Sequence, residues 1–274
     1  MSKKAFEFVK INELPKKPRK KGVVEVRVPY YASSPTLTYI EDLLDAWSDY
    51  FDGMKFACGT MRMMDRTLVR KIIDACHGHK VYVSTGGFVE RIVIQGKSAV
   101  NRYFEECHSL GYDVVEISSG FVNLGLEEKL ELVSKVRDLG MKPKPEISMM
   151  IGAGAGTHRV GYKPKMRPMS EFLAEAKAHI DSGAEIIMVE SEGLTEDLPP
   201  EKWRKDVIMA LVRKFGYERW MFEAADPEVF KWYLLNVSRD ANLFIDHTQV
   251  TEFNAWRLRL WGDEGIWKEY NRKH

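Results

Sequence analysis

Short apolar runs alternate with amphipathic stretches along the whole chain. Short apolar runs at 112–120, 184–193 and 217–226, the first two rich in valine and isoleucine, each lead into an acidic residue just before a turn. Such runs lack polar alternation, which is typical of strands covered on both faces, as in a parallel sheet. Between the runs, apolar residues recur three and four positions apart, for example in 36–51 and 66–79, and this spacing predicts helices. The pattern therefore predicts an α/β fold.

Counting these segments gives eight strand-then-helix units of about thirty residues each. Strands are predicted at 22–30, 53–59, 81–87, 112–120, 144–151, 184–190, 217–223 and 241–246, and helices at 36–51, 66–79, 98–110, 126–139, 170–181, 200–215, 227–237 and 252–261. Eight is the number of units in a (β/α)8 TIM barrel. A doubly wound open sheet is the alternative, but the repeat continues evenly to the last unit. We therefore expect one barrel domain over 22–262, with a basic arm at 1–21 and a tail at 263–274.

Composition narrows the class of protein. A chain of 274 residues with 45% hydrophobic and 30% charged residues can bury a full core. No apolar run approaches the roughly 20 residues that span a bilayer, and the first twenty residues lack the apolar centre of a secretory signal. Three cysteines without CxxC spacing support neither a disulfide framework nor a zinc site. We expect a cytoplasmic protein without a membrane partner.

Charge gives no indication of nucleic-acid binding. The net charge is +1, and the visible basic cluster is the arm at 15–21, which is typical of a solvated entry segment but also resembles a nuclear-localisation signal. Two tryptophans near the C-terminus, Trp256 and Trp261, suit the core or a homo-oligomer contact better than a ligand platform. We expect a small anionic substrate as the partner and no nucleic acid.

Acids at strand ends are the main chemical signal. Glu116, Glu146, Glu190 and Glu223 each end or follow a predicted strand, and Asp246 ends the last one. In a parallel barrel these ends converge, and like charges raise one another's pKa unless a cation compensates. Hard oxygen ligands favour Mg²⁺ or Mn²⁺, so the four glutamates are predicted metal ligands. The alternative is that some of these acids cap the following helix or pair with Lys55.

Other candidates surround these acids. Lys55 lies inside a short strand, so we assign it a catalytic role with Glu116 and Glu190. The turn at Gly86 and Gly87 lets backbone N–H groups approach an anion, although a merely tight turn fits equally well. The predicted substrate-binding residues at strand ends are Gly86, Gly87, Ser118, Asn242 and His247.

A glycine-rich segment follows the fifth strand. Residues 152–156 resemble the start of a dinucleotide fingerprint, but no helix follows them as that motif requires. The chain continues with Arg159, Lys163, Lys165 and Arg167, which predicts a lid or an anion-binding loop, with Arg159 as a substrate ligand. An exposed loop without a function is the alternative, because length alone does not distinguish the two. Neither GxSxG nor a P-loop is present, so acyl transfer and nucleotide-driven chemistry lack their usual markers.

With these residues in place, the chain resembles the phosphosulfolactate synthase family, which includes plant heat-stress-associated proteins. The resemblance runs from Lys17 to about Gly262, and its landmarks are Met54-Lys-Phe-Ala-Cys-Gly-Thr60, Thr85-Gly-Gly-Phe-Val-Glu90, Gly111-Tyr-Asp-Val-Val-Glu-Ile-Ser-Ser-Gly120, Pro145-Glu146, Val189-Glu190, Phe222-Glu-Ala224 and Leu258-Arg-Leu260. It implies a (β/α)8 barrel and, in the synthases, Mg²⁺-dependent addition of sulfite to phosphoenolpyruvate.

The chain departs from the synthase pattern mostly at basic groups. Synthases resemble one another in Asp-Lys-Gly on the first strand, where this chain has Arg27-Val-Pro29, and in a lysine after the fifth-strand glutamate, where it has Ser148-Met-Met150. An arginine is missing from Glu190-Ser-Glu-Gly193, Asn-Leu-Gly-Asn is replaced by Asn242-Leu-Phe-Ile-Asp246, and Leu-Arg-Gly-Asp-Thr by Leu260-Trp-Gly-Asp-Glu264. The carboxylates and Lys55 remain.

We therefore expect a Mg²⁺-dependent lyase or synthase that adds or removes a nucleophile such as sulfite across a double bond of a small carboxylate, through an enolate-like intermediate. Two alternatives remain open. One is the full phosphosulfolactate synthase activity, with the basic loop replacing the lost phosphate ligands. The other is a non-catalytic stress or interaction protein on the same barrel.

Overall fold

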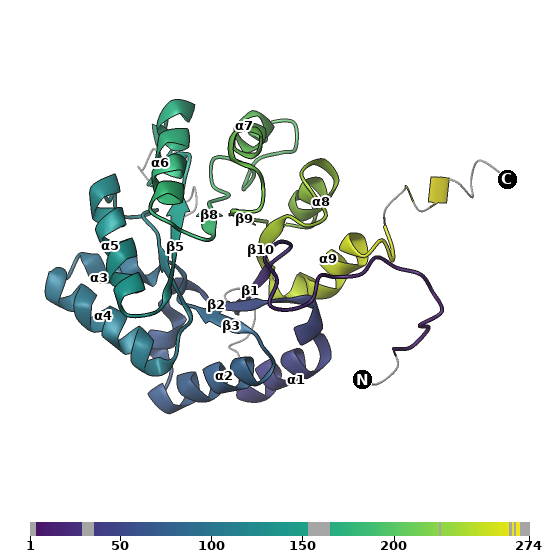
Figure 1. Ribbon diagram of the computed structural model, residues 1–274, viewed down its shortest axis with the longest axis horizontal. Helices are drawn as coiled ribbons and strands as arrows, with labels where there is room; N and C mark the ends of the chain where they lie inside the picture. The colour runs from purple at the N-terminus through teal and green to yellow at the C-terminus, as the bar shows by residue number, and fades with distance from the viewer. Residues whose placement is uncertain are drawn as a thin grey trace.

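Eight parallel strands close into a barrel surrounded by helices (Figure 1). The computed structural model describes residues 4–28, 36–152, 165–224, 226–262, 265, 267 and 268. In space the barrel strands follow the order β1-β10-β9-β8-β5-β4-β3-β2. They are β1 (Val24–Val28), β2 (Gly53–Phe56), β3 (Tyr82–Ser84), β4 (Val114–Ile117), β5 (Lys142–Ile147), β8 (Ile187–Val189), β9 (Trp220–Glu223) and β10 (Asn242–Asp246). The predicted TIM barrel is confirmed.

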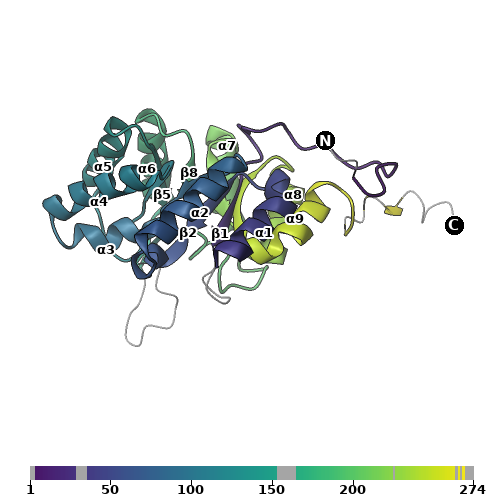
Figure 2. The same cartoon turned by 90° about the horizontal axis from the view of Figure 1, so that it is seen from below.

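The helices form a ring around these strands, as Figures 1 and 2 show. They are α1 (Leu37–Trp47), α2 (Arg66–Gly78), α3 (Val89–Val93), α4 (Lys97–Leu110), α5 (Leu126–Asp138), α6 (Met169–Asp181), α7 (Lys205–Phe215), α8 (Pro227–Asn236) and α9 (Val250–Arg257). Short 3-10 helices follow three strands, as η2 (Ala57–Met63), η3 (Gly86–Phe88) and η4 (His247–Gln249), and a fourth, η1 (Ser48–Tyr50), follows α1. Within the described residues, no helix is long and apolar enough to cross a membrane.

Local sequence signals set many of these boundaries. The carboxylate of Asp65 accepts a hydrogen bond from the backbone N–H of Thr67 at 2.8 Å and so caps α2. Gly111 ends α4 with a φ of 92°, a left-handed conformation that favours glycine. Pro227 lies in the first turn of α8, where its missing N–H costs nothing.

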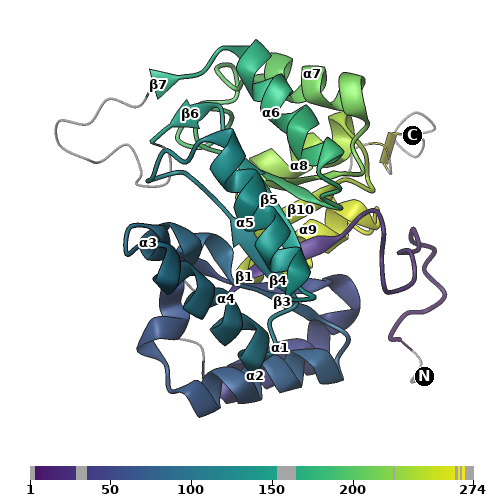
Figure 3. The same ribbon diagram turned by 60° about the vertical axis from the view of Figure 1, so that its left-hand side comes forward.

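Two predicted elements differ from the structure. The run predicted as one strand over 144–151 divides into β5 and a separate strand β6 (Met150–Ile151), which pairs antiparallel with β7 (Lys165–Met166). Figure 3 shows this hairpin extending outward beside α6. The helix predicted at 200–215 begins at Lys205 instead, because residues 199–204 form turns after two prolines.

The core has two parts. The larger lies between the strands and the helices and contains fully buried aromatic residues such as Phe104, Phe172 and Phe230. A small apolar cluster of Val23, Met188, Met221 and Phe244 lies apart from it, with Tyr82 and Ile186 packed against it. Charged residues of the barrel strands are also buried, including Glu25 on β1 and Lys144 on β5. Buried charges need partners, and their pairing defines the candidate site.

Candidate active site

A buried network of alternating charges joins four strands. The Lys55 Nζ on β2 lies 2.9 Å from Oε2 of Glu116 on β4, and the Lys144 Nζ on β5 lies 3.2 Å from the same oxygen. Lys144 also forms a hydrogen-bonded ion pair with Oε2 of Glu25 on β1. All four side chains are at most 8% exposed. Two lysines therefore share Glu116. We call the four residues Glu25, Lys55, Glu116 and Lys144 the ionic network.

The ionic network favours the charged forms of Lys55 and Glu116. Burial alone lowers the pKa of Lys55, but the charges of Glu116 and other nearby glutamates outweigh burial and raise this pKa well above its usual value. Burial alone raises the pKa of Glu116, but Lys55 and Lys144 outweigh it and lower this pKa. The Lys55 ammonium also lies 4.0 Å from the ring centroid of Phe244, a favourable cation–π distance. Lys55 is thus a permanent cation and Glu116 a permanent anion.

A second set of carboxyl groups, Glu146, Glu190 and Glu223, faces the same cavity. Burial raises the pKa of Glu146 well above its usual value, and the negative charge of Glu116 adds to this shift. Burial also raises the pKa of Glu190, with further contributions from Glu223 and Glu146. Within the part of the chain that the structure describes, the Glu146 carboxylate forms no hydrogen bond or ion pair. Glu146 and Glu190 are therefore available to a proton or a cation, whereas Glu223 already pairs with Arg27 at 3.7 Å.

The two sets meet in a cavity of about 520 Å³ at the carboxyl end of the barrel, which we call the mouth cavity. Its lining includes Phe88 and Phe121, which add apolar surface, and the charged residues Lys55, Glu116, Glu146, Glu190 and Glu223. A cavity of this size suits a small organic ligand. Parallel barrels bind their substrates at this end.

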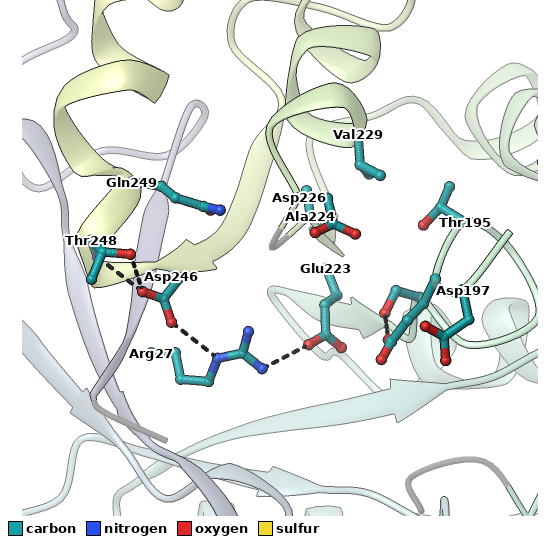
Figure 4. Close-up of a pocket in the computed structure, with 12 residues that line it drawn as sticks. Arg27, Thr195, Asp197, Glu223, Ala224, Asp226, Val229, Asp246, Thr248 and Gln249 are labelled. Carbon is teal, nitrogen blue, oxygen red and sulfur yellow. Dashed lines mark hydrogen bonds and ion pairs between the residues drawn. The ribbon is translucent and has the colours of Figure 1, made fainter. Parts of the chain in front are cut away.

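A second hollow of about 510 Å³ adjoins the mouth cavity and shares Arg27 and Glu223 with it. Figure 4 shows the Arg27 guanidinium between Glu223, at 3.7 Å, and Asp246, at 3.6 Å. The Asp246 carboxylate also accepts hydrogen bonds from the backbone N–H and the hydroxyl of Thr248 at 3.0 and 2.6 Å. Asp197 and Asp226 add further carboxylates to the walls, so this hollow is mainly acidic.

Glu196 belongs to the same acidic hollow. Its carboxylate accepts a hydrogen bond from the hydroxyl of Ser191, the residue after Glu190. Burial, with the nearby charge of Glu223, raises the pKa of Glu196 to about 7. This carboxyl group therefore changes its protonation near neutral pH.

The predicted turn at Gly86 and Gly87 lies against the mouth cavity. Gly86 has a φ of +60°, and a Cβ there would lie 2.8 Å from the carbonyl oxygen of Phe56, so close packing already requires glycine. Gly87 lines the cavity, as does Ser118. The hydroxyl of Ser118 donates to the Glu90 carboxylate at 2.7 Å. Anion binding at this turn stays a prediction.

Two predicted substrate ligands, Asn242 and His247, do not line the cavity in the described structure. Asn242 is at the amino end of β10, where its amide oxygen accepts from Val23 N and its amide nitrogen donates to Glu218 O. The His247 ring is buried, and its Nδ1 lies 3.0 Å from the carbonyl oxygen of Arg27. Both side chains therefore hold the barrel together. Arg159 lies outside the described residues, as does most of the predicted lid.

The end of that lid is described, and Arg167 is structural. Its guanidinium pairs with Glu175 on α6 and donates to the carbonyl oxygen of Ser148 at 3.2 Å. Arg167 therefore anchors the end of the segment and does not face the mouth cavity. Lys165 is exposed on β7.

Three residues of the site escaped the sequence reasoning. Glu25 lies on the strand predicted at 22–30, but the sequence does not tell which face of that strand it occupies. Lys144 precedes Glu146 by two positions, and residues two apart on a strand share a face, so this spacing was the available signal. Glu90 stood only in a family landmark, yet its carboxylate also accepts hydrogen bonds from the backbone N–H groups of Phe121 and Val122 at 2.6 and 2.8 Å. Glu90 therefore holds the loop after β4 at the cavity wall.

A metal site is not assembled in this geometry. Among the described residues, no three histidine, cysteine, aspartate or glutamate side chains converge closely enough to hold an ion. The donor chemistry nevertheless suits a hard divalent cation, because Glu146 and Glu190 face one cavity with Glu223 and repel one another. Glu116 differs from these three because two lysines already compensate it.

Comparison with known proteins places the chain in a family. A family model described as (2R)-phospho-3-sulfolactate synthase (ComA) matches residues 12–263. The chain belongs to this family. The predicted resemblance is therefore confirmed over nearly the whole barrel.

Proteins similar to this chain include a heat-stress-associated protein and a phosphosulfolactate synthase. The chain is 28% identical over 268 residues to Protein HEAT-STRESS-ASSOCIATED 32 of Arabidopsis thaliana, which covers 94% of this chain and 93% of that protein. It is 25% identical over 252 residues to Phosphosulfolactate synthase of Methanothermobacter thermautotrophicus, covering 90% and 92% of the two chains. KGPDC from Streptococcus mutans shares the fold, with a TM-score of 0.53 at 9% identity over 87% of this chain and 98% of that one.

Proposed function

We propose that this ComA-family chain is an enzyme that adds a nucleophile such as sulfite to, or removes it from, the double bond of a small anionic carboxylate. One observation carries the proposal. A fixed cation, Lys55, and two carboxyl groups of raised pKa, Glu146 and Glu190, face the same mouth cavity. A cation beside groups that can exchange protons is what an enolate-like intermediate needs.

The reaction balances without an oxidant or a reductant. The sulfur lone pair of sulfite forms a bond to the β-carbon of the unsaturated acid. The π-electron pair then moves onto the carboxylate, which becomes an enediolate. A proton returns to the α-carbon, so that acceptor plus bisulfite equals product, and the reverse sequence is elimination. Lys55 lies where its ammonium would hold the carboxylate and stabilise the developing charge, and Glu116 keeps Lys55 in place.

Glu146, Glu190 and Glu223 are the residues that would hold Mg²⁺ or Mn²⁺. These three carboxylates line the mouth cavity, and Lys55 and Lys144 directly pair none of them. When bound, the cation supplies Lewis-acid stabilisation of negative charge on the substrate carboxylate. Without it, Glu146 and Glu190 retain protons more readily, because burial and the repulsion of nearby carboxylates raise their pKa values.

The acceptor is proposed to lack a phosphate ester. TIM barrels often bind phosphate at the loops after their seventh and eighth strands, which are β9 and β10 here. These loops present Asp226 and Asp246, and the adjoining wall adds Asp197 and Glu196. A phosphate ester carries nearly two negative charges and is usually held by basic side chains or helix N-termini. Full phosphosulfolactate synthase activity is therefore the less favoured enzymatic reading.

Proton exchange tests the proposal without knowledge of the natural acceptor. The protein with Mg²⁺ is incubated in D₂O with lactate or 3-sulfolactate, and ¹H NMR follows loss of the proton on the carbon next to the carboxylate. In parallel, sulfite is added to acrylate or phosphoenolpyruvate, and ¹H NMR follows the appearance of new adducts. We expect exchange or addition with at least one unphosphorylated acid. Lys55→Met should abolish it, whereas Lys142→Met, which removes an exposed lysine on β5, should not. Equal rates in both variants and in the wild-type chain would show that the mouth cavity is not the site.

A second candidate function rests on the comparison with the plant protein. Identity to Protein HEAT-STRESS-ASSOCIATED 32 is 28%, against 25% to the synthase of Methanothermobacter. Under this alternative the barrel is a stress-associated protein that needs no turnover. The finding that would favour it is a chain that neither binds divalent cations nor exchanges protons with any acid tested, yet whose loss reduces heat tolerance in its host.

A further inference from the structure

A smaller cavity of about 220 Å³ lies outside the barrel, between η2, α2 and α4, and we call it the side cavity. Its apolar wall includes Met61, Met64, Val69, Phe88 and Leu110. An apolar cavity of roughly 150 Å³ in another protein stays dry and binds benzene. The side cavity therefore has room for one aromatic ring with short substituents.

The buried end of the side cavity carries an unused hydrogen-bond donor. Tyr112 lines the cavity and is only 4% exposed. Its hydroxyl is buried and has no hydrogen-bond partner among the described residues. Burial raises the pKa of Tyr112, so the phenol stays neutral and keeps its proton. A buried hydroxyl without a partner is unfavourable, and a ligand oxygen would relieve this penalty.

The rim of the side cavity carries an unused cation. Arg62 and Arg66 both line it, and Arg66 forms an ion pair with Glu106. Arg62 is exposed and forms no ion pair or hydrogen bond within the described part of the chain. The rim therefore has one uncompensated positive charge.

We propose that the side cavity binds a small hydroxylated aromatic carboxylate. The ring would pack against Met64, Phe88 and Leu110, the ring hydroxyl would meet Tyr112, and the carboxylate would face Arg62. Apolar walls, a neutral donor at the buried end and a free guanidinium at the rim together select this class. A hydrocarbon would leave both polar groups unused, and a sugar would leave the apolar walls unsatisfied.

Phe88 connects this ligand to the mouth cavity, because its side chain lines both cavities. Gly59 on η2 lies directly under the ring, since a Cβ at that position would be 2.3 Å from a Phe88 ring carbon. The Phe88 side chain thus borders both cavities. In sequence, Phe88 directly follows the turn at Gly86 and Gly87. A ligand in the side cavity that restrains Phe88 should slow amide hydrogen exchange in residues 86–94.

The test uses 4-hydroxyphenylacetate and two analogues that each lack one predicted contact. Phenylacetate lacks the ring hydroxyl, and 4-hydroxyphenylacetamide lacks the charge. By isothermal titration calorimetry we expect the wild-type chain to bind 4-hydroxyphenylacetate with a Kd of about 0.1 to 1 mM, in keeping with eleven or so ligand atoms. Each analogue should bind roughly three- to tenfold more weakly.

Variants assign each loss to one side chain. Tyr112→Phe should weaken 4-hydroxyphenylacetate roughly three- to tenfold but leave phenylacetate unchanged. Arg62→Gln should weaken the acid by a similar factor but leave the amide unchanged. Lys71→Gln removes an exposed positive charge from α2 that does not line the cavity, and it should change nothing. Met64→Trp should fill the cavity and abolish binding, and circular dichroism checks that this variant folds.

Several results would overturn the proposal. They are no heat of binding at 10 mM ligand, binding that survives Met64→Trp in a folded chain, or a Tyr112→Phe loss of equal size for phenylacetate. Binding that Lys55→Met removes would place the ligand in the mouth cavity and would equally refute a side site. Because none of these measurements uses turnover, failure here leaves the proposed enzymatic function untouched.

Discussion

Replacing Lys144 by methionine tests whether the ionic network holds the barrel and the site together. Lys144 is 3% exposed and contacts both Glu25 and Glu116, and methionine has a similar length without the charge. Glu116 keeps Lys55, but Glu25, at 0% exposure, loses its ion pair. Removing one member of a buried pair costs about 3 to 5 kcal/mol, because the other charge stays buried and unpaired. For a chain of this size that is a fall in melting temperature of roughly 6 to 20 °C.

Equilibrium urea unfolding measures this cost, and two further variants make the result decisive. The double variant Glu25→Gln/Lys144→Met should recover about 1 to 2 kcal/mol relative to Lys144→Met, since no buried charge is then left alone. Lys142→Met on the same strand breaks a pair with Glu185 that is 66% and 72% exposed, and it should cost under about 1 kcal/mol. If Lys144→Met costs no more than Lys142→Met, or if the double variant is no more stable than Lys144→Met, the reasoning about the ionic network fails.

Three further results are expected. Mg²⁺ or Mn²⁺ at about 100 times its Kd should add roughly 2.7 kcal/mol to the free energy of unfolding by mass action, and Glu190→Gln should remove this gain and turnover while keeping the fold. Phosphoenolpyruvate with sulfite should turn over far below about 1 to 10 per second, since each missing charge-assisted phosphate contact costs roughly 1.5 to 3 kcal/mol. Because the pKa of Glu196 is raised to about 7 in the folded chain, metal-free stability should fall by up to roughly 3 kcal/mol between about pH 4.5 and 7.

Each of these results has its own control. Calorimetric titration without divalent binding at neutral pH would remove the metal from the proposal. Turnover of phosphoenolpyruvate at ordinary enzyme rates would restore the synthase. For Glu196, the folded state binds more protons than the unfolded state in that window, so stability is highest at its acidic end. The variant Glu196→Gln should make the curve less steep by this contribution, while Glu146 and Glu190 keep theirs, and an unchanged slope would contradict the raised pKa of Glu196.

The sequence predicted the barrel and the convergence of its strand-end acids, because both follow from local patterns. Apolar runs ending in Glu116, Glu190 and Glu223 specify buried parallel strands, and parallel strands bring their carboxyl ends together. These three acids do line one cavity in the structure. Nothing beyond the apolar runs and the acids at their ends was needed for that part of the prediction.

Pairing across the barrel was beyond the sequence, because it depends on which strands close the circle. Glu25 and Lys144 are 119 residues apart and meet only inside the closed barrel. Asn242 is the second residue of the strand predicted at 241–246, so its place at the amino end was visible in the sequence, and its side chain binds backbone groups there. His247 follows a strand end but turns toward the carbonyl oxygen of Arg27, a local contact that no periodicity reveals.

Arg19 binds the basic arm to the amino-terminal end of the barrel. Its guanidinium lies 2.8 Å from Oδ1 of Asp52, both side chains are at most 7% exposed, and the other oxygen of Asp52 accepts the backbone N–H of Val24 at the start of β1. Residues 6, 8, 9 and 11 are exposed. Fusion partners or affinity tags can therefore be joined before the arm. Shortening the polypeptide past Arg19 would leave the buried carboxylate of Asp52 without its ion-pair partner. The practical starting point for any recombinant version of this barrel lies upstream of that arginine, not at the first residue of β1.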